Sequence, residues 1–164
     1  MKKQKGFSLI ELLIVVAIIL IIAAIAIPNL IRSKMAANEA SAVASLRTIN
    51  TAEVVYSSTY SVPNLFAANL SALSDGGTPA NCTGTAVPSS TSACLIDSAL
   101  AAAVSTTVSK SGYSFTYAPA AGTYSVNADP VAPNSTGVRQ FFTDQTAVIR
   151  QNSGAVATAT STPI

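Results

Sequence analysis

The sequence predicts an α+β fold, in which one long N-terminal α-helix packs on a C-terminal antiparallel sheet of three or four strands. An uncharged apolar run covers residues 12–27, and apolar residues then recur every three or four positions up to residue 60. Both patterns predict helix. After Gly112 apolar and polar residues alternate, which predicts strands. With 164 residues, the chain has room for this helix and one small domain.

The N-terminal part of the predicted helix is long enough to cross a membrane. Residues 7–31 carry a single charge, Glu11. At about 1.5 Å per residue they span roughly 37 Å, compared with about 30 Å for the hydrocarbon core of a bilayer. Lys2, Lys3 and Lys5 precede this segment and are expected to stay in the cytoplasm under the positive-inside rule. The C-terminal part is therefore expected outside.

Glu11 is unusual, because a carboxylate inside a membrane costs about 2.5–3.5 kcal/mol and is a functional-site candidate that needs a cationic partner. No Lys or Arg lies within the apolar segment. The available partner is a free α-amino group, which cleavage after Gly6 would create at Phe7, four residues before Glu11. Two opposite charges that are each costly in an apolar bundle become tolerable when they pair.

The sequence GFSLIELL at residues 6–13, followed by a long apolar run up to Pro28, resembles the class III leader of type IV prepilins. The resemblance covers residues 1–35, and beyond them only the order of helix, loop and sheet matches. It implies the ladle-shaped pilin fold, removal of the leader, residues 1–6, by a prepilin peptidase, and N-methylation of Phe7. It further implies that Glu11 neutralises the N-terminus of a neighbouring subunit during filament assembly.

The resemblance implies a structural subunit that polymerises with its own copies into a type IV pilus, which supports adhesion, twitching motility or DNA uptake. The precursor would lie in the inner membrane, and the pilus assembly machinery would extract it into a filament on the bacterial surface. One alternative is a pseudopilin of a type II secretion system, which shares the leader. The alternative from another class is an exported or membrane-anchored binding module.

In that last alternative the apolar segment is a plain anchor or a secretory signal peptide, and residues 24–26 resemble its A-x-A cleavage site. The run is longer than the 7–15 residues of a typical signal-peptide core. Neither form of this alternative explains Glu11 at its position near the start of the run.

Beyond the apolar segment the helix is expected to continue as an amphipathic helix over residues 32–60. Pro28 removes one backbone donor and clashes with the preceding turn, which predicts a kink or an unwound stretch. An ordinary tolerated membrane-helix proline is the alternative. Many type IV pilins have a glycine about eight residues before this proline, where this chain has Leu20. The stripe expected to face the sheet consists of Ala42, Leu46, Ile49, Ala52, Tyr56 and Tyr60.

Residues 61–111 are rich in Pro, Gly and small polar residues and are predicted to form a connecting loop region. Two short helices are expected within it, at 64–73 and, capped by Asp97, at 98–104. Cys82 and Cys94 are expected to form a disulfide, because the domain is exported. The bridge would contribute about 3 kcal/mol. The alternative is two free thiols.

The sheet is expected within residues 112–152, with one face buried against the long helix. The first hairpin places three residues of each strand on one face: Tyr113, Phe115 and Tyr117, then Tyr124, Val126 and Ala128. A second pair of strands is predicted at 138–143 and 147–151, with a turn at Asp144 and Gln145. Residues 153–164 are small, polar and uncharged, and are expected to form a surface tail.

The composition argues against enzymatic function. Without histidine the chain cannot form a Ser-His-Asp triad, a Cys-His pair or a CxxCH haem site. We expect no catalytic residue, cofactor or metal. The alternative is a calcium loop that uses Asp129, Asn127 or Asp144. After loss of the leader lysines, six basic and seven acidic side chains remain. This balance predicts no nucleic-acid partner for the subunit alone.

Overall fold

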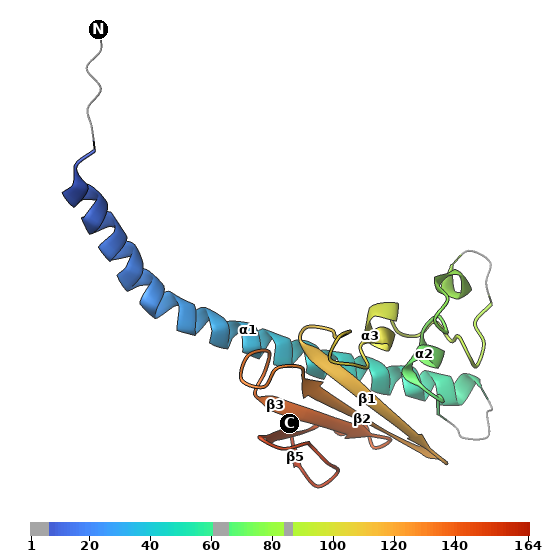
Figure 1. Ribbon diagram of the computed structural model, residues 1–164. Helices are drawn as coiled ribbons and strands as arrows, with labels where there is room; N and C mark the ends of the chain where they lie inside the picture. The colour runs from blue at the N-terminus through green and yellow to red at the C-terminus, as the bar shows by residue number, and fades with distance from the viewer. Residues whose placement is uncertain (1–6, 61–65, 84–86) are drawn as a thin grey trace. The chain divides into compact units, whose positions relative to one another are not determined.

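The computed structural model describes residues 7–60, 66–83 and 87–164 (Figure 1). The chain divides into two compact units, Met1–Lys34 and Met35–Ile164. The elements, in chain order, are α1 (Leu9–Thr59), α2 (Leu70–Leu73), the 3-10 helix η1 (Pro79–Cys82), α3 (Ser98–Ala102), β1 (Tyr113–Ala120), β2 (Thr123–Pro130), β3 (Arg139–Asp144), β4 (Arg150–Ser153) and β5 (Thr162–Pro163). This is the predicted α+β class.

α1 is one continuous helix of 51 residues, and Pro28 lies inside it. Of the two forms of break predicted at Pro28, the unwound stretch is not observed, because residues on both sides of the proline remain helical. A proline removes one backbone hydrogen bond of the helix. Loss of that one bond leaves the helix continuous here.

The sheet has five antiparallel strands in the order β1-β2-β3-β4-β5, one more than the upper limit of the prediction. The first hairpin is confirmed, with Phe115 opposite Ala128 and Tyr117 opposite Val126. Its two-residue turn contains Gly122, which has a φ of +73°. A backbone with positive φ favours glycine, and this explains why the strands reverse direction there.

The C-terminal segment differs from the prediction of a surface tail. β5 pairs with β4, and Ala157 is buried. Asn127 Nδ2 of β2 donates to the Ala157 carbonyl at 2.8 Å, and Arg150 Nη1 of β4 donates to the Ser161 carbonyl at 3.1 Å. The turn after β3 is also longer than predicted, so β4 begins at Arg150. The small, polar residues of this segment do not show the alternation that predicts a strand, so its pairing with β4 was not predicted.

Both outer strands of the sheet carry a proline. β1 contains Pro119, and its Phe115 N–H donates to the Ala103 carbonyl at 2.7 Å. β5, at the opposite edge, contains Pro163. Proline has no N–H to offer to an incoming strand, and natural sheets use it to block edge-to-edge pairing. Neither edge of this sheet therefore presents a long row of free donors.

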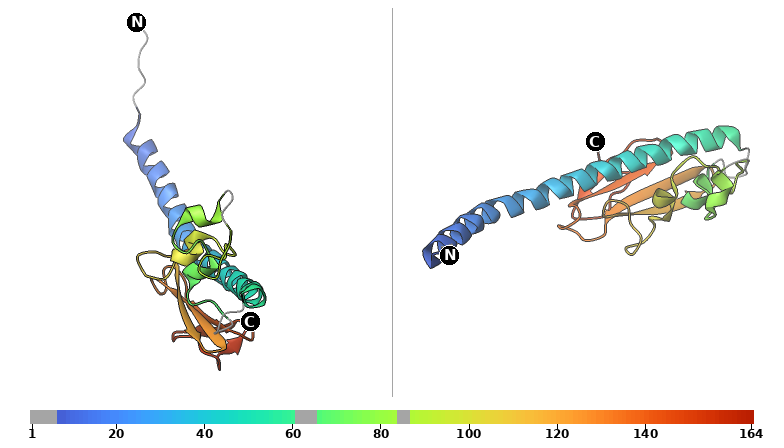
Figure 2. Two further views of the ribbon diagram at one scale, coloured as in Figure 1. Left: turned by 90° about the vertical axis from the view of Figure 1, so that its right-hand side faces the viewer. Right: turned by 90° about the horizontal axis from the view of Figure 1, so that it is seen from above.

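The core of the second unit lies between the sheet and residues 35–59 of α1 (Figures 1 and 2). The predicted helical stripe is buried at five positions, Ala42, Leu46, Ile49, Ala52 and Tyr56, and Tyr60 packs against it partly buried. The sheet contributes its alternating face: Tyr113, Phe115, Tyr124, Val126, Ala128 and Phe141. Helix residues that recur on one face every 3.6 positions thus pack against strand residues that recur every two positions.

The connecting region contains shorter helices than predicted. α2 begins at Leu70, because the side chain of Asn69 caps it by accepting from Ala72 N–H at 2.8 Å. Residues 61–65 of the connecting region lie outside the described residues. α3 starts as predicted, with Asp97 Oδ1 accepting from Leu100 N–H at 2.6 Å.

The predicted disulfide joins Cys82 and Cys94. Residues next to the bridge form backbone hydrogen bonds with the end of α2: Ala93 N–H donates to the Ala72 carbonyl and Cys94 N–H to the Ser74 carbonyl. The bridge therefore fastens a loop that is otherwise held by few buried side chains.

We expect the Cys82→Ser/Cys94→Ser double variant to lower the free energy of unfolding of the second unit by about 3 kcal/mol, since the unfolded chain gains loop entropy. Urea unfolding of the full chain in detergent, followed by tyrosine near-UV circular dichroism, measures this. Val87→Ala, at an exposed position in the same loop, is the control and should have no effect. Equal stability of the double variant and the wild type would contradict the prediction.

Candidate functional site

The N-terminal unit presents its apolar side chains outward. The large apolar residues from Leu9 to Ile31 are each between 45% and 76% exposed. In the described part of the chain, α1 is the helix long and apolar enough to cross a membrane, with a mean hydropathy of 3.3 in its best window and no buried residue there. Exposure on this scale is unfavourable in water. This half of α1 therefore requires lipid or other apolar helices around it.

The first turn of α1 brings together two of the predicted site residues. Glu11 Oε2 accepts from the backbone N–H of Ser8 at 3.0 Å, and the Ser8 carbonyl accepts from Leu12 N–H at 3.3 Å. Phe7 immediately precedes Ser8 and is 83% exposed. The carboxylate is thus held at the positive end of the helix dipole, close to Phe7. Gly6, the residue before the predicted cleavage point, lies outside the described residues.

This Ser8–Glu11 contact is half of a capping box, in which a Glu at the third helical position bonds the N–H of the capping residue. The prediction from sequence treated Glu11 only as the partner of an amine. The sequence does contain the pattern typical of a capping box, Ser8-x-x-Glu11, directly before an apolar run. Pro28 and the Cys82–Cys94 bridge are not part of this site.

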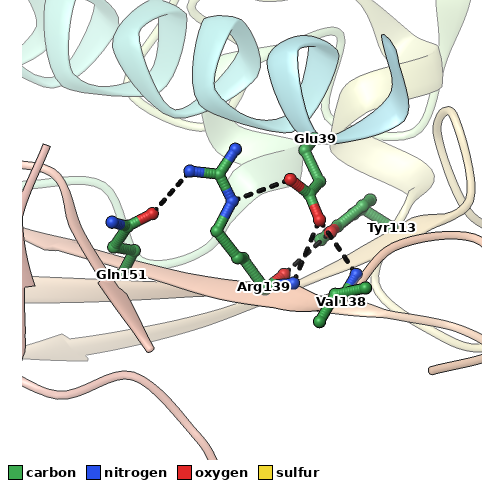
Figure 3. Close-up of polar contacts among 5 residues, drawn as sticks. All are labelled: Glu39, Tyr113, Val138, Arg139 and Gln151. Atoms are coloured by element: carbon green, nitrogen blue, oxygen red, sulfur yellow. Dashed lines mark hydrogen bonds and ion pairs between the residues drawn. The ribbon is translucent and has the colours of Figure 1, made fainter. Parts of the chain in front are cut away.

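In the second unit, Glu39 of α1 attaches the helix to the start of β3 (Figure 3). Its Oε1 accepts from Val138 N–H at 2.9 Å and from Arg139 N–H at 3.1 Å. Its Oε2 accepts from Arg139 Nε at 2.7 Å. The Glu39 side chain is only 9% exposed, whereas the Arg139 side chain is 42% exposed. One carboxylate therefore satisfies two backbone donors and one guanidinium.

The electrostatics of Glu39 favour its charged form. Burial opposes ionisation most strongly, but the N–H groups of Val138 and Arg139 and the Arg139 guanidinium together outweigh it. The net result is a pKa of Glu39 below the ordinary value. Glu39 is therefore an anion that clamps α1 to β3.

Neighbouring residues hold this clamp in position. Arg139 Nη1 donates to Gln151 Oε1 of β4 at 2.7 Å (Figure 3). The guanidinium also lies 5.6 Å from the centre of the Phe141 ring. Tyr113 OH donates to the Arg139 carbonyl at 2.7 Å. The Tyr113 ring lies against Gly137, where an added Cβ would collide with it. The approach of β1 to the start of β3 thus requires glycine.

A second polar attachment lies further along α1. Asn50 Nδ2 donates to Thr143 Oγ1 of β3 at 2.9 Å, and Tyr124 OH of β2 donates to Asn50 Oδ1 at 2.9 Å. All three residues are buried. A buried amide with partners on two strands sets the position of the helix along the sheet.

Glu39, Asn50 and Arg139 were not predicted from the sequence. A signal existed for the first two, because they are polar residues in phase with the apolar stripe of α1. A polar side chain on a buried stripe must find a partner. The identity of that partner depends on residues about 100 positions away, and the sequence does not reveal it.

We expect Glu39→Gln to lower the free energy of unfolding at neutral pH by about 1–3 kcal/mol, because a charge-assisted contact is lost. The wild-type stabilisation is complete above the unfolded-state pKa of about 4.3 and is lost as pH falls through the lower folded-state pKa. The variant should lack this acid-dependent loss. Unfolding midpoints of the full chain at several pH values, with exposed Arg47→Gln as control, test this; an unchanged pH profile in Glu39→Gln would contradict it.

Comparisons with known proteins agree with these features. Residues 1–27 match the family model described as a prokaryotic N-terminal methylation motif. The chain is 41% identical over 101 residues to the type IV wide pilus major component PilA4 of Thermus thermophilus, covering 58% of this chain and 74% of that protein. It is 49% identical over 51 residues to the type IV major pilin protein PilA of Myxococcus xanthus, covering 31% of this chain and 23% of that protein. No solved structure matches the chain.

The methylation motif covers Lys2, Lys3 and Lys5, Glu11, and the apolar half of α1 as far as Ile27. The similarity to PilA4 spans most of that protein. A membrane-anchored precursor with an outward-facing apolar helix, followed by a helix-on-sheet unit, is the arrangement expected of a subunit of a surface filament. The chain therefore belongs to the type IV pilin family, as a pilin subunit of type IV pili.

Proposed function

We propose that a prepilin peptidase cleaves this chain between Gly6 and Phe7, that the new α-amino group of Phe7 is methylated, and that the subunit then enters a filament through α1. The observation that carries the proposal is the exposed apolar surface of α1, which surrounds Glu11 inside the methylation motif, where the carboxylate accepts from the Ser8 N–H. Cleavage requires prepilin peptidase as a partner, and entry into the filament requires the pilus assembly machinery.

Glu11 is proposed to pair with the methylated amine of Phe7 in a neighbouring subunit. Its Oε2 is engaged by Ser8 N–H, whereas Oε1 forms no hydrogen bond with the residues that the structure describes. The free oxygen leaves room for a second donor from outside the chain. Within a bundle of apolar helices, an amine and a carboxylate would direct the register of neighbouring subunits because each is costly alone.

The proposed role is structural, with no catalytic step performed by the subunit itself. Apolar helices exchange lipid for protein on entering the filament, so packing between helices and the Glu11 pair supply the specificity. Pro28 is proposed as the place where α1 adapts to this packing, since its missing hydrogen bond makes the helix weakest there.

The processing proposal predicts the chemical identity of the mature N-terminus. Intact mass and N-terminal sequencing of protein from sheared surface filaments should show a chain that begins at N-methylated Phe7. Recovery from surface filaments also distinguishes a pilin from a type II secretion pseudopilin. A chain that begins near Ile27, or one that retains Met1 and stays in the membrane, would overturn the proposal.

The pairing proposal predicts that Glu11→Gln is processed but assembles poorly. Leaving one charge of a buried pair alone costs about 3–5 kcal/mol. Because about 1.4 kcal/mol corresponds to a factor of ten, we expect at least a tenfold loss of surface filament. Immunoblots of sheared and membrane fractions measure it. Ser8→Ala keeps both the backbone donor and the carboxylate, so it is the control; normal filament yield in Glu11→Gln would refute the pairing.

A further inference from the structure

Glu53 of α1 is a buried carboxyl group without a cationic neighbour among the described residues. Its side chain is fully buried, with 0% exposure. The two ion pairs among the described residues, Lys110–Asp97 and Arg139–Glu39, do not include it. The titratable groups that act on it or feel its charge are the phenols of Tyr56 on α1, Tyr117 on β1 and Tyr124 on β2. Asp144 of β3 also acts on Tyr124. None of these groups is a cation.

Three hydrogen-bond contacts form a closed ring around this carboxyl group. Glu53 Oε1 lies 2.6 Å from Tyr117 Oη, and Tyr117 Oη lies 2.9 Å from the Ala67 carbonyl oxygen. The Ala67 N–H donates to Glu53 Oε2 at 3.1 Å. Ala67 is itself fully buried, so both of its backbone groups depend on this ring. The ring joins α1, the segment that precedes α2, and β1.

The number of protons in the ring decides the charge of Glu53. Tyr117 Oη has two close neighbours that are both acceptors when Glu53 is ionised, but a phenol carries only one proton. With an ionised Glu53, one of the two short contacts would therefore join two lone pairs. A neutral Glu53 supplies the missing proton on Oε1. Glu53 then donates to Tyr117, Tyr117 donates to Ala67, and Ala67 donates back to Glu53.

We propose that Glu53 is a neutral carboxylic acid in the folded subunit and that its proton closes this ring as a pH-sensitive lock between α1, Ala67 and β1. The lock holds while Glu53 is protonated and opens when the carboxyl ionises. This device acts on the second unit and does not depend on the processing or pairing proposed above.

The electrostatic environment agrees with the geometry. Burial raises the pKa of Glu53 above its ordinary value, although donation by Tyr117 and Ala67 to the ionised carboxylate would act in the opposite direction. Burial, and next the hydrogen bond to Glu53, raise the pKa of Tyr117 far above its usual range, so the phenol keeps its proton. A folded-state pKa above the unfolded value means that the stabilisation is complete below about pH 4.3 and declines as pH rises through the folded-state pKa. The contribution of Glu39 to stability has the opposite pH dependence, because its folded-state pKa lies below the ordinary value.

The direct test is carbon NMR of the full chain in detergent with ¹³C-labelled glutamate. The chain contains three glutamates, Glu11, Glu39 and Glu53, and the Glu53 signal is assigned by its loss in Glu53→Gln. The Glu53 carboxyl should keep the chemical shift of the protonated form at pH values above about 4.3, where a free glutamate is ionised. Glu39 is the internal reference and should titrate below that value. A Glu53 signal that titrates at or below about 4.3 would overturn the proposal.

A second test uses variants that separate the ring from the charge. Gln at position 53 can donate to Tyr117 and accept from Ala67 N–H, so it reproduces the neutral ring. Between about pH 4 and pH 8, wild type should lose several degrees of unfolding midpoint as pH rises. Glu53→Gln should lack this decline, with a midpoint at or above the wild-type value at neutral pH. Glu53→Ala should unfold earlier at every pH. A Glu53→Gln midpoint below wild type at neutral pH would refute the lock.

Discussion

The second unit depends on the burial of one stripe of α1 beneath the sheet. Leu46 and Ile49 are fully buried there, as are Phe115 and Val126 on the facing strands. A helix in water gains little stability from its own hydrogen bonds, and a sheet with one apolar face cannot leave that face uncovered. Helix and sheet therefore stabilise each other. The N-terminal half of α1 has no such cover in the described chain and needs lipid or other subunits instead.

Three polar side chains on the buried stripe make the attachment specific. Glu39 is an anion bonded to β3, Asn50 is an amide bonded to β2 and β3, and Glu53 is, by our proposal, a neutral acid bonded to β1. Each costs free energy if the helix shifts and leaves it unpaired. Apolar packing alone tolerates small shifts, whereas these contacts do not.

Patterns local in sequence predicted much of this structure. The apolar run, the helical stripe and the alternating strands determine the long helix and the first hairpin, because each follows from the periodicity of one element. The leader motif is also a contiguous sequence, and it predicted the family. The disulfide was predictable because the chain contains only two cysteines in an exported domain.

Other features depend on residues far apart in the chain. The partners of Glu39 and Glu53 arise only when the sheet and helix come together, and the burial of Ala157 depends on its contact with Asn127 of β2. The sequence by itself determined a pilin with a leader, an apolar helix and an antiparallel sheet. Only the tertiary structure decided which polar groups meet on the buried stripe, because a buried group's partners and its charge depend on the three-dimensional surroundings rather than on the residue type.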